Sequence, residues 1–139
     1  MNAYICCLGD NFTVLKMTSR TSNVYPYNPS YKPLYNVTIE SGTTTVTDNI
    51  TVNSFIVIIN KALYYGKKVD HSLINPNQFI CYVTMVWDHP FDPKRGICLE
   101  KCEGGKIDLI PYVRKIGFRS QVPTEEDLMT LPHIKVTSD

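Results

Sequence analysis

The stretch Phe55-Ile56-Val57-Ile58-Ile59 is the longest uninterrupted apolar run in the chain. Its length is that of a strand, and an unbroken apolar pattern is typical of a strand that is covered on both faces. The segment Ala62-Leu63-Tyr64-Tyr65 continues in the same style, and Gly66 ends it. A bilayer span needs about 20 apolar residues, so this run predicts a buried strand and no membrane segment.

Further β-prone segments precede this run. Phe12 to Met17 predicts a strand after a short turn. Leu34 to Glu40 and Thr43 to Asp48 predict a hairpin, with its turn at Ser41-Gly42. The segment from Thr18 to Pro33 is expected to be a loop, because its three prolines lack the backbone donor that a helix or a central strand requires.

Shorter strands are predicted after the run. Thr84 to Trp87 has the composition of a short strand. Ile97 to Cys102 and Lys106 to Ile110 flank Glu103-Gly104-Gly105, which is a strong signal for a hairpin.

Two short helices are also predicted. The first covers Asn75 to about Tyr82, where a capping residue is followed by Pro76 at the first helical position. The second covers Thr124 to about Thr130, where three carboxylates in the first turn match the helix dipole. A C-terminal tail begins at about Leu131. We therefore expect a single domain over residues 1–139 that is all-β with two short helices.

The charge and the cysteine count limit the partners and the compartment. Fourteen Lys and Arg against thirteen Asp and Glu give a formal net charge of +1, which provides no basic field for nucleic acid. The five cysteines form no even disulfide framework, and the N-terminus lacks a basic n-region. We therefore expect a cytoplasmic, non-secreted protein with neither a nucleic-acid nor a membrane partner.

Residues that carry common chemistries are not grouped along the chain. Cys98 and Cys102 are four apart on a predicted strand and Cys6-Cys7 are adjacent, so neither pair has the spacing of a zinc or redox motif. The three histidines stand in separate, turn-like contexts. The sequence contains no P-loop, dinucleotide or nucleophile-elbow glycine pattern. We therefore expect no metal site and no cofactor.

A series of short motifs nevertheless occurs in a definite order. It comprises Asn36 to Gly42, the apolar run to Ile59, Ala62-Leu63-Tyr64, Ser72 to Phe79, and Arg119 to Leu128. In this order and spacing the chain resembles the retropepsin-like aspartic protease region of Copia-type retrotransposon polyproteins. In that family a turn of the A-D-G type is followed by a flap hairpin, a V-L-Y-like motif ends an apolar strand, and N-L-L-S-x-x-Q-L enters a helix. The resemblance implies a retropepsin-like barrel or sandwich.

The resemblance also implies a binding site and partners. A flap-like hairpin that contacts peptide would consist of Gly42, Thr43, Thr44, Thr45, Val46, Thr47 and Asp48. A retropepsin subunit supplies half of an active site, so the resemblance implies a homodimer. The implied ligand is an extended peptide or polyprotein segment.

Catalysis in this family needs two aspartates that share a proton, one from a D-[ST]-G-A turn of each subunit. The resemblance aligns Ala3 with the alanine of that turn, so the aspartate would precede Met1. Asp10 lacks a following Ser/Thr-Gly, and Glu40 aligns with the hairpin turn, so both are weak candidates for a substitute. We therefore expect no catalytic residue within the chain.

Three interpretations remain open at this point. The first is a retrotransposon-derived pseudoprotease that at most dimerises or binds an extended peptide by strand addition. The second is an active aspartic endopeptidase of a retroelement polyprotein, with its catalytic aspartate upstream of Met1. The third is a β-rich interaction domain that is unrelated to proteases.

Overall fold

The computed structural model describes residues 6–26, 28–47, 52–69, 71–75, 78, 84–87, 98–101, 106–112 and 115–137. The strands are β1 (Cys7–Gly9), β2 (Thr13–Val24), β3 (Leu34–Thr47), β4 (Ser54–Gly66), β5 (Thr84–Trp87), β6 (Cys98–Lys101), β7 (Lys106–Asp108), β8 (Ile110–Tyr112), β9 (Lys115–Gly117) and β10 (His133–Lys135), and the helix α2 covers Glu125–Thr130. The described part of the chain is therefore mostly β-sheet with very little helix, which confirms the all-β prediction.

The largest sheet has five strands. β1, β4, β3 and β2 lie side by side in this order, and β10 also pairs with β4. β3 is antiparallel to both of its neighbours, whereas β1 and β10 are parallel to β4. β10 lies beside Ile56, Val57 and Ile58, and β1 lies beside the last part of β4. These two short strands therefore share one edge of β4.

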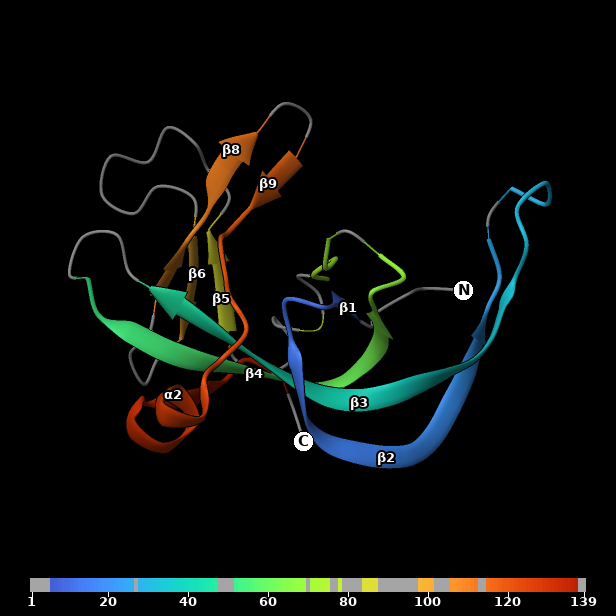
Figure 1. Ribbon diagram of the computed structural model, residues 1–139. Coiled ribbons are helices and arrows are strands. Elements are labelled where there is room, and N and C mark those ends of the chain that lie inside the picture. Colours follow the sequence, from blue (N-terminus) through green and yellow to red (C-terminus); the bar gives the residue numbers. More distant parts are fainter. Residues whose placement is uncertain are drawn as a thin grey trace.

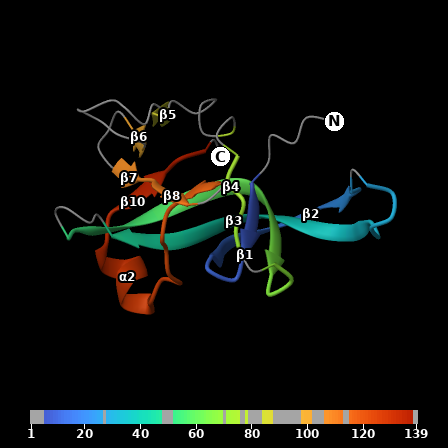
Figure 2. The same ribbon diagram turned by 90° about the horizontal axis from the view of Figure 1, so that it is seen from above.

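β2 and β3 form a long hairpin, here called the arm, that extends away from the other strands (Figure 1). The end of the arm at which β2 ends and β3 begins lies opposite α2 in two perpendicular views (Figures 1 and 2). The strands of the arm end at Val24 and restart at Leu34, so the three prolines lie between them. The predicted loop is therefore wrong from Thr18 to Val24, because pairing with β3 holds this polar segment extended.

The hairpin predicted around Ser41-Gly42 is also wrong, because β3 continues through both residues. Ser41 pairs with Lys16 of β2, and Gly42 pairs with residues of both neighbouring strands. A Cβ atom on Gly42 would lie 2.5 Å from the Leu8 Cδ1 atom, so the glycine permits close packing rather than a turn.

The residues predicted as a flap-like hairpin, Gly42 to Asp48, do not form a separate hairpin in the described structure, and their contact with a peptide stays a prediction. Gly42 to Thr47 is the last part of β3, and Asp48 lies outside the described residues. The side chains from Thr43 to Val46 are buried, so only Thr47 of this segment is exposed to a ligand.

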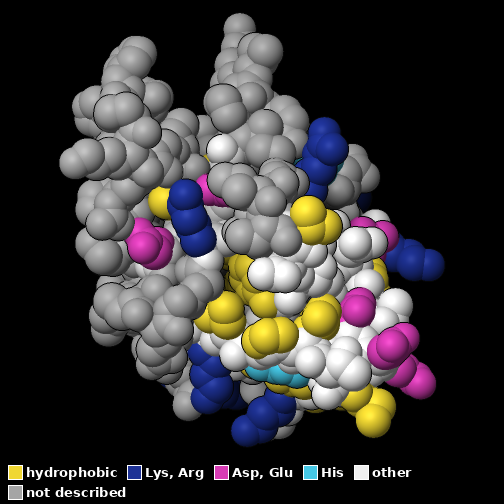
Figure 3. Space-filling model, turned by 90° about the vertical axis from the view of Figure 1, so that its left-hand side faces the viewer, with side chains coloured by type: hydrophobic (Ala, Val, Ile, Leu, Met, Phe, Trp, Pro, Cys, Tyr) yellow, Lys and Arg dark blue, Asp and Glu magenta, His cyan; other side chains and the backbone are white. Residues whose placement is uncertain are grey.

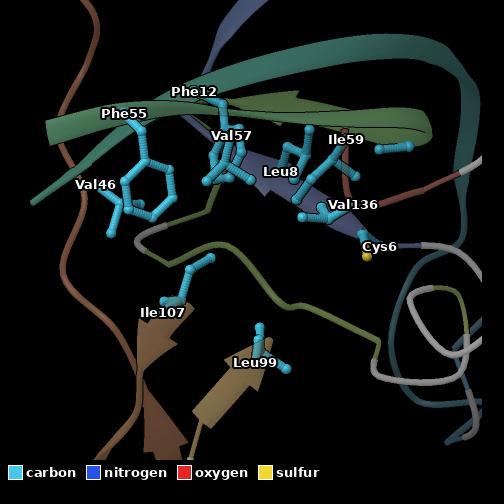
Figure 4. Close-up of a cluster of buried hydrophobic side chains, with 11 residues drawn as sticks. Cys6, Leu8, Phe12, Val46, Phe55, Val57, Ile59, Leu99, Ile107 and Val136 are labelled. Atoms are coloured by element: carbon cyan, nitrogen blue, oxygen red, sulfur yellow. The ribbon is translucent and has the colours of Figure 1, made fainter. Parts of the chain in front are cut away.

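β4 confirms the prediction made from the apolar run. Phe55 to Ile59 are all buried, and alternate residues point to opposite faces of the sheet. Phe55, Val57 and Ile59 belong to the main core cluster. Leu99 and Ile107 face them from a second sheet, which β5, β6 and β7 form (Figure 4). Burial of each such side chain contributes about 1.5–3 kcal/mol, so this contact between the sheets holds the domain together.

The remaining elements agree with the sequence in part. β5, β6 and β7 form an antiparallel sheet, which confirms the predicted strand at Thr84 and the hairpin after it. α2 confirms the helix predicted after Thr124, and a capping box between Thr124 and Asp127, which was not predicted, closes its first turn. The helix predicted for Asn75 to about Tyr82 lies outside the described residues except for Asn75 and Gln78. The predicted tail contains β10.

Candidate peptide-binding edge

The two acidic residues considered for catalysis lie in different environments. Asp10 is exposed in the turn after β1, whereas Glu40 is 4% exposed in β3. The Oε2 atom of Glu40 has no hydrogen-bond partner, and no ion pair joins either carboxylate to another described residue. Proton sharing requires two adjacent carboxylates, so the described residues do not bring these two acids into that arrangement.

The side of β4 that carries β1 and β10 is here called the closed edge. On the side of β1 that faces away from β4, the backbones of Cys7 and Leu73 exchange two hydrogen bonds, at 2.8 and 2.7 Å. Side chains complete the pairing, because the Cys6 N–H donates to Gln78 Oε1 and the Gly9 N–H donates to Ser72 Oγ, both at 2.8 Å. These donors are therefore unavailable to another chain.

A bulge in β4 strengthens the closed edge. Lys61 has a positive φ of 53°, and two residues of β4 stand there opposite Ser41 alone. The Asn60 N–H donates to Thr137 Oγ1 at 2.6 Å, and Gln78 Nε2 donates to the Asn60 carbonyl at 2.8 Å. The bulge thus directs backbone groups of β4 toward residues from two distant parts of the chain.

The side of β2 that faces away from β3 is here called the open edge. Within the described residues β2 has one strand neighbour, so its second side has no ladder. β1 and β2 are the two outer strands in the order of this sheet, and β2, with twelve residues, is the longer. Most residues in the middle of β2 are exposed. Unpaired N–H and C=O groups on such a strand are a template for an added strand.

Bulges divide the open edge into short straight parts. Between the pairs Met17–Glu40 and Thr21–Thr38, three residues of β2 stand opposite Ile39 alone. The Thr18 hydroxyl donates to the Ile39 carbonyl and accepts the Arg20 N–H, so a side chain replaces the missing ladder bonds. Bulges on edge strands limit long, unspecific pairing, so this edge suits a short partner.

The exposed side chains of the open edge are basic. Lys16 and Arg20 are both exposed, and neither forms an ion pair with a described residue. Residues 11–39 contain Lys16, Arg20 and Lys32 but no Asp or Glu, and the single acidic residue of β3, Glu40, is buried. The arm therefore has a positive charge that the nearly neutral composition of the whole chain conceals.

Aromatic side chains are exposed at the tip of the arm. Tyr25 is 58% exposed, Tyr31 is 68% exposed and Tyr35 is 63% exposed. The rings of Tyr25 and Tyr35 meet edge to face with centroids 6.3 Å apart, next to the last pair of the ladder. Such rings offer large, rigid contact area to a ligand at a low cost in side-chain entropy.

The end of the molecule opposite the arm has a different surface. Hydrophobic side chains gather there with acidic and basic ones around them (Figure 3). The first turn of α2 contributes three carboxylates, from Glu125, Glu126 and Asp127. Exposed acidic charge therefore lies at the α2 end, whereas the one acidic residue of the arm, Glu40, is buried.

The cysteines of the closed edge are part of the packing. Cys6 is fully buried in the core cluster, and its burial raises the pKa of the thiol to about 11. Burial also raises the pKa of the half-buried Cys7, although a hydrogen bond with Tyr65 opposes the shift. A high pKa leaves little thiolate at neutral pH, so neither residue has the character of a nucleophile or a metal ligand.

The described residues form neither a metal site nor a membrane-spanning helix. Within the described residues, no group of three or more His, Cys, Asp or Glu could hold a metal ion. His71 and His133 are exposed on separate segments, and His89 lies outside the described residues. No helix in the described part of the chain is long and apolar enough to cross a membrane.

Comparisons with models of protein families, with curated proteins and with solved structures found no significant match.

The open edge was not predicted from the sequence, because Thr18 to Val24 were expected to lie in a loop and because the net charge of the whole chain conceals the charge of this segment. The signal that could have revealed the edge is the 29-residue interval between Asp10 and Glu40, which holds three cations and no acid.

Proposed function

We propose that this protein is a retropepsin-like domain that binds an extended peptide by adding it as a strand to the open edge of β2. The observation that carries the proposal is the twelve-residue edge strand with one neighbour in the described sheet. The opposite edge offers no equivalent place, because β1, β10 and the bridge at Leu73 occupy it.

The order of motifs and the β-rich fold support the retropepsin-like assignment. The long β2–β3 hairpin has its tip between Val24 and Leu34, before the position at which the resemblance places a flap, so the hairpin does not add to this support. The described residues support binding rather than cleavage, because Asp10 is exposed and Glu40 is buried without a carboxylate partner.

Nuclear magnetic resonance of the ¹⁵N-labelled protein tests this proposal. The probe is an eight-residue peptide of alternating Thr and Val with acetyl and amide ends, whose pattern favours extended backbone. We expect signals of Thr13 to Val24 to shift and their outward-facing amides to exchange more slowly, while signals of β1 and β10 stay unchanged.

The control peptide carries N-methyl groups on its two central residues. Adjacent residues of a strand point their N–H groups to opposite sides, so this change removes pairing on both edges of the peptide. We expect the control peptide to leave β2 unchanged. Equal binding of both peptides, or shifts confined to the closed edge, would contradict strand addition, and pepstatin-sensitive hydrolysis of the probe would favour a protease.

A further inference from the structure

We infer that the peptide bound at the open edge is acidic, with carboxylates that meet Lys16 and Arg20. This inference rests on the proposed function and specifies its ligand. Both cations are exposed on β2 without an ion-pair partner among the described residues. Opposite charges on neighbouring strands stabilise their pairing, whereas like charges destabilise it.

The distribution of charge supplies the main argument. Residues 11–39 contain no acidic residue, and Glu40, the one acidic residue of the arm, is buried in β3 rather than exposed beside Lys16 and Arg20. Lys16 lies two residues before the bulge that Thr18 maintains, and Arg20 is the last residue of that bulge, so both cations stand close to the irregular part of the edge. A short acidic strand alongside β2 would place carboxylates near both cations while its backbone pairs with the edge.

The same charges argue against a second copy of β2 as the occupant. Two copies paired about a twofold axis would bring the Lys16 and Arg20 side chains of one strand toward those of the other. Because β2 contains no acidic residue, this arrangement creates repulsion without a compensating ion pair. The edge itself therefore does not favour the homodimer implied by the resemblance.

Nucleic acid is the other anionic ligand to consider. The arm combines cations with exposed tyrosines, which can stack on bases. However, its three cations are few for binding phosphates at physiological salt, and a nucleic acid leaves the N–H and C=O groups of the edge unpaired. An acidic peptide uses both the charge and the open backbone of β2.

Three octapeptides that differ in charge test the inference. Glu, Gln or Lys alternates with Val, and binding to the full chain is followed through the amide signals of β2. At low salt we expect the Glu peptide to bind about three- to tenfold more tightly than the Gln peptide, since exposed ion pairs contribute modestly. The Lys peptide should bind most weakly, and 0.5 M NaCl should reduce the differences.

Two double variants locate the preference. K16Q/R20Q removes both cations from β2, and K67Q/K68Q removes two exposed cations from the turn after β4. We expect the preference for Glu over Gln to disappear in K16Q/R20Q and to persist in K67Q/K68Q. Thermal unfolding should show both variants folded, because all four side chains are exposed.

The outcomes separate the inference from the function on which it rests. Equal binding of the Glu and Gln peptides at β2 would overturn the acidic preference and leave strand addition intact. Absence of binding by all three peptides would overturn both. Tighter binding of a twelve-residue oligothymidylate, lost in K16Q/R20Q, would replace the peptide with a single-stranded nucleic acid.

Discussion

The two edges of the large sheet solve the problem of unpaired backbone groups in different ways. The closed edge uses β1, β10, the Leu73 backbone and the side chains of Ser72 and Gln78. The open edge has no strand beyond β2 in the described structure and uses bulges and cations instead. The first device stabilises the fold, whereas the second leaves room for a partner.

This difference means that equal substitutions should have unequal effects on the two edges. β1 on the closed edge contributes the fully buried Leu8 to the core, whereas most side chains in the middle of β2 on the open edge are exposed. The following predictions measure the contrast, beginning with the largest effect.

The first prediction compares two leucines. Leu8 in β1 is fully buried, whereas Leu15 in β2 is 51% exposed. We expect Leu8→Ala to lower the free energy of unfolding by about 2–5 kcal/mol, because it leaves a cavity in the core. Leu15→Ala should cost less than about 1 kcal/mol, because little of its contact area is lost. Urea unfolding measures both values, and equal losses would show that the edges do not differ in packing.

The second prediction concerns the contact between Gly42 and Leu8. A Cβ atom at position 42 would overlap the Leu8 side chain, so Gly42→Ala should cost about 1–3 kcal/mol. In the Leu8→Ala background the same change should cost less, because the overlapping Cδ1 atom is gone. A double-mutant cycle measures this coupling, and strictly additive effects would refute the close packing of β1 on β3.

The third prediction uses the pH dependence of the closed edge. The pKa of the Cys6 thiol is raised from 9.0 to about 11 in the folded protein, chiefly by burial. Between these values the unfolded chain loses the proton that the folded chain keeps, so stability falls as pH rises. The contribution of Cys6 is complete below pH 9 and should fall by about 1.4 kcal/mol at pH 10.

Cys6→Ala provides the control for this titration. Other groups also titrate between pH 8 and pH 10, so the informative quantity is the difference between the two proteins. We expect the unfolding free energy of the variant to fall less steeply over this range. Parallel curves for both proteins would mean that the Cys6 thiol titrates normally in the folded state.

The sequence predicted the central strand and α2 better than it predicted either edge of the sheet. The run Phe55 to Ile59 revealed the central strand, because an unbroken apolar pattern has few explanations in a domain of this size. The helix after Thr124 was equally predictable, since its capping residues are local in sequence. Both features depend on neighbouring residues.

The errors arise where distant residues determine the conformation. Ser41-Gly42 has the composition of a turn, yet the approach of Leu8 requires glycine inside a strand. Thr18 to Val24 has weak strand propensity and becomes extended through its pairing with β3. No local pattern reveals which carbonyl the Thr18 hydroxyl will bind.

The sequence predicted the kind of candidate site but not the residues that form it. Strand addition of an extended peptide follows from the resemblance, but the residues from Gly42 to Val46 are buried and the exposed edge belongs to β2. The residues differ from those expected because a turn was predicted at Ser41-Gly42, whereas β3 continues through both residues.

The last and smallest prediction tests how the closed edge is secured at its far end. α2 leads into β10, since the Leu131 N–H donates to the Asp127 carbonyl and the Ile56 N–H donates to the Pro132 carbonyl. Thr124 caps this helix by accepting the Asp127 N–H at 3.1 Å. Thr124→Ala should therefore cost about 1 kcal/mol and speed the exchange of the Ile56 amide.

Thr130→Ala is the matched control within the same helix. The Thr130 hydroxyl donates to the Glu126 carbonyl of the preceding turn, a bond that contributes little to helix stability. Alanine also has the higher helix propensity, so this change should be neutral or slightly stabilising. If Thr124→Ala accelerates exchange at Ile56 while Thr130→Ala does not, the cap of α2 helps to hold β10 in place. If the two variants behave alike, β10 closes the edge independently of the helix.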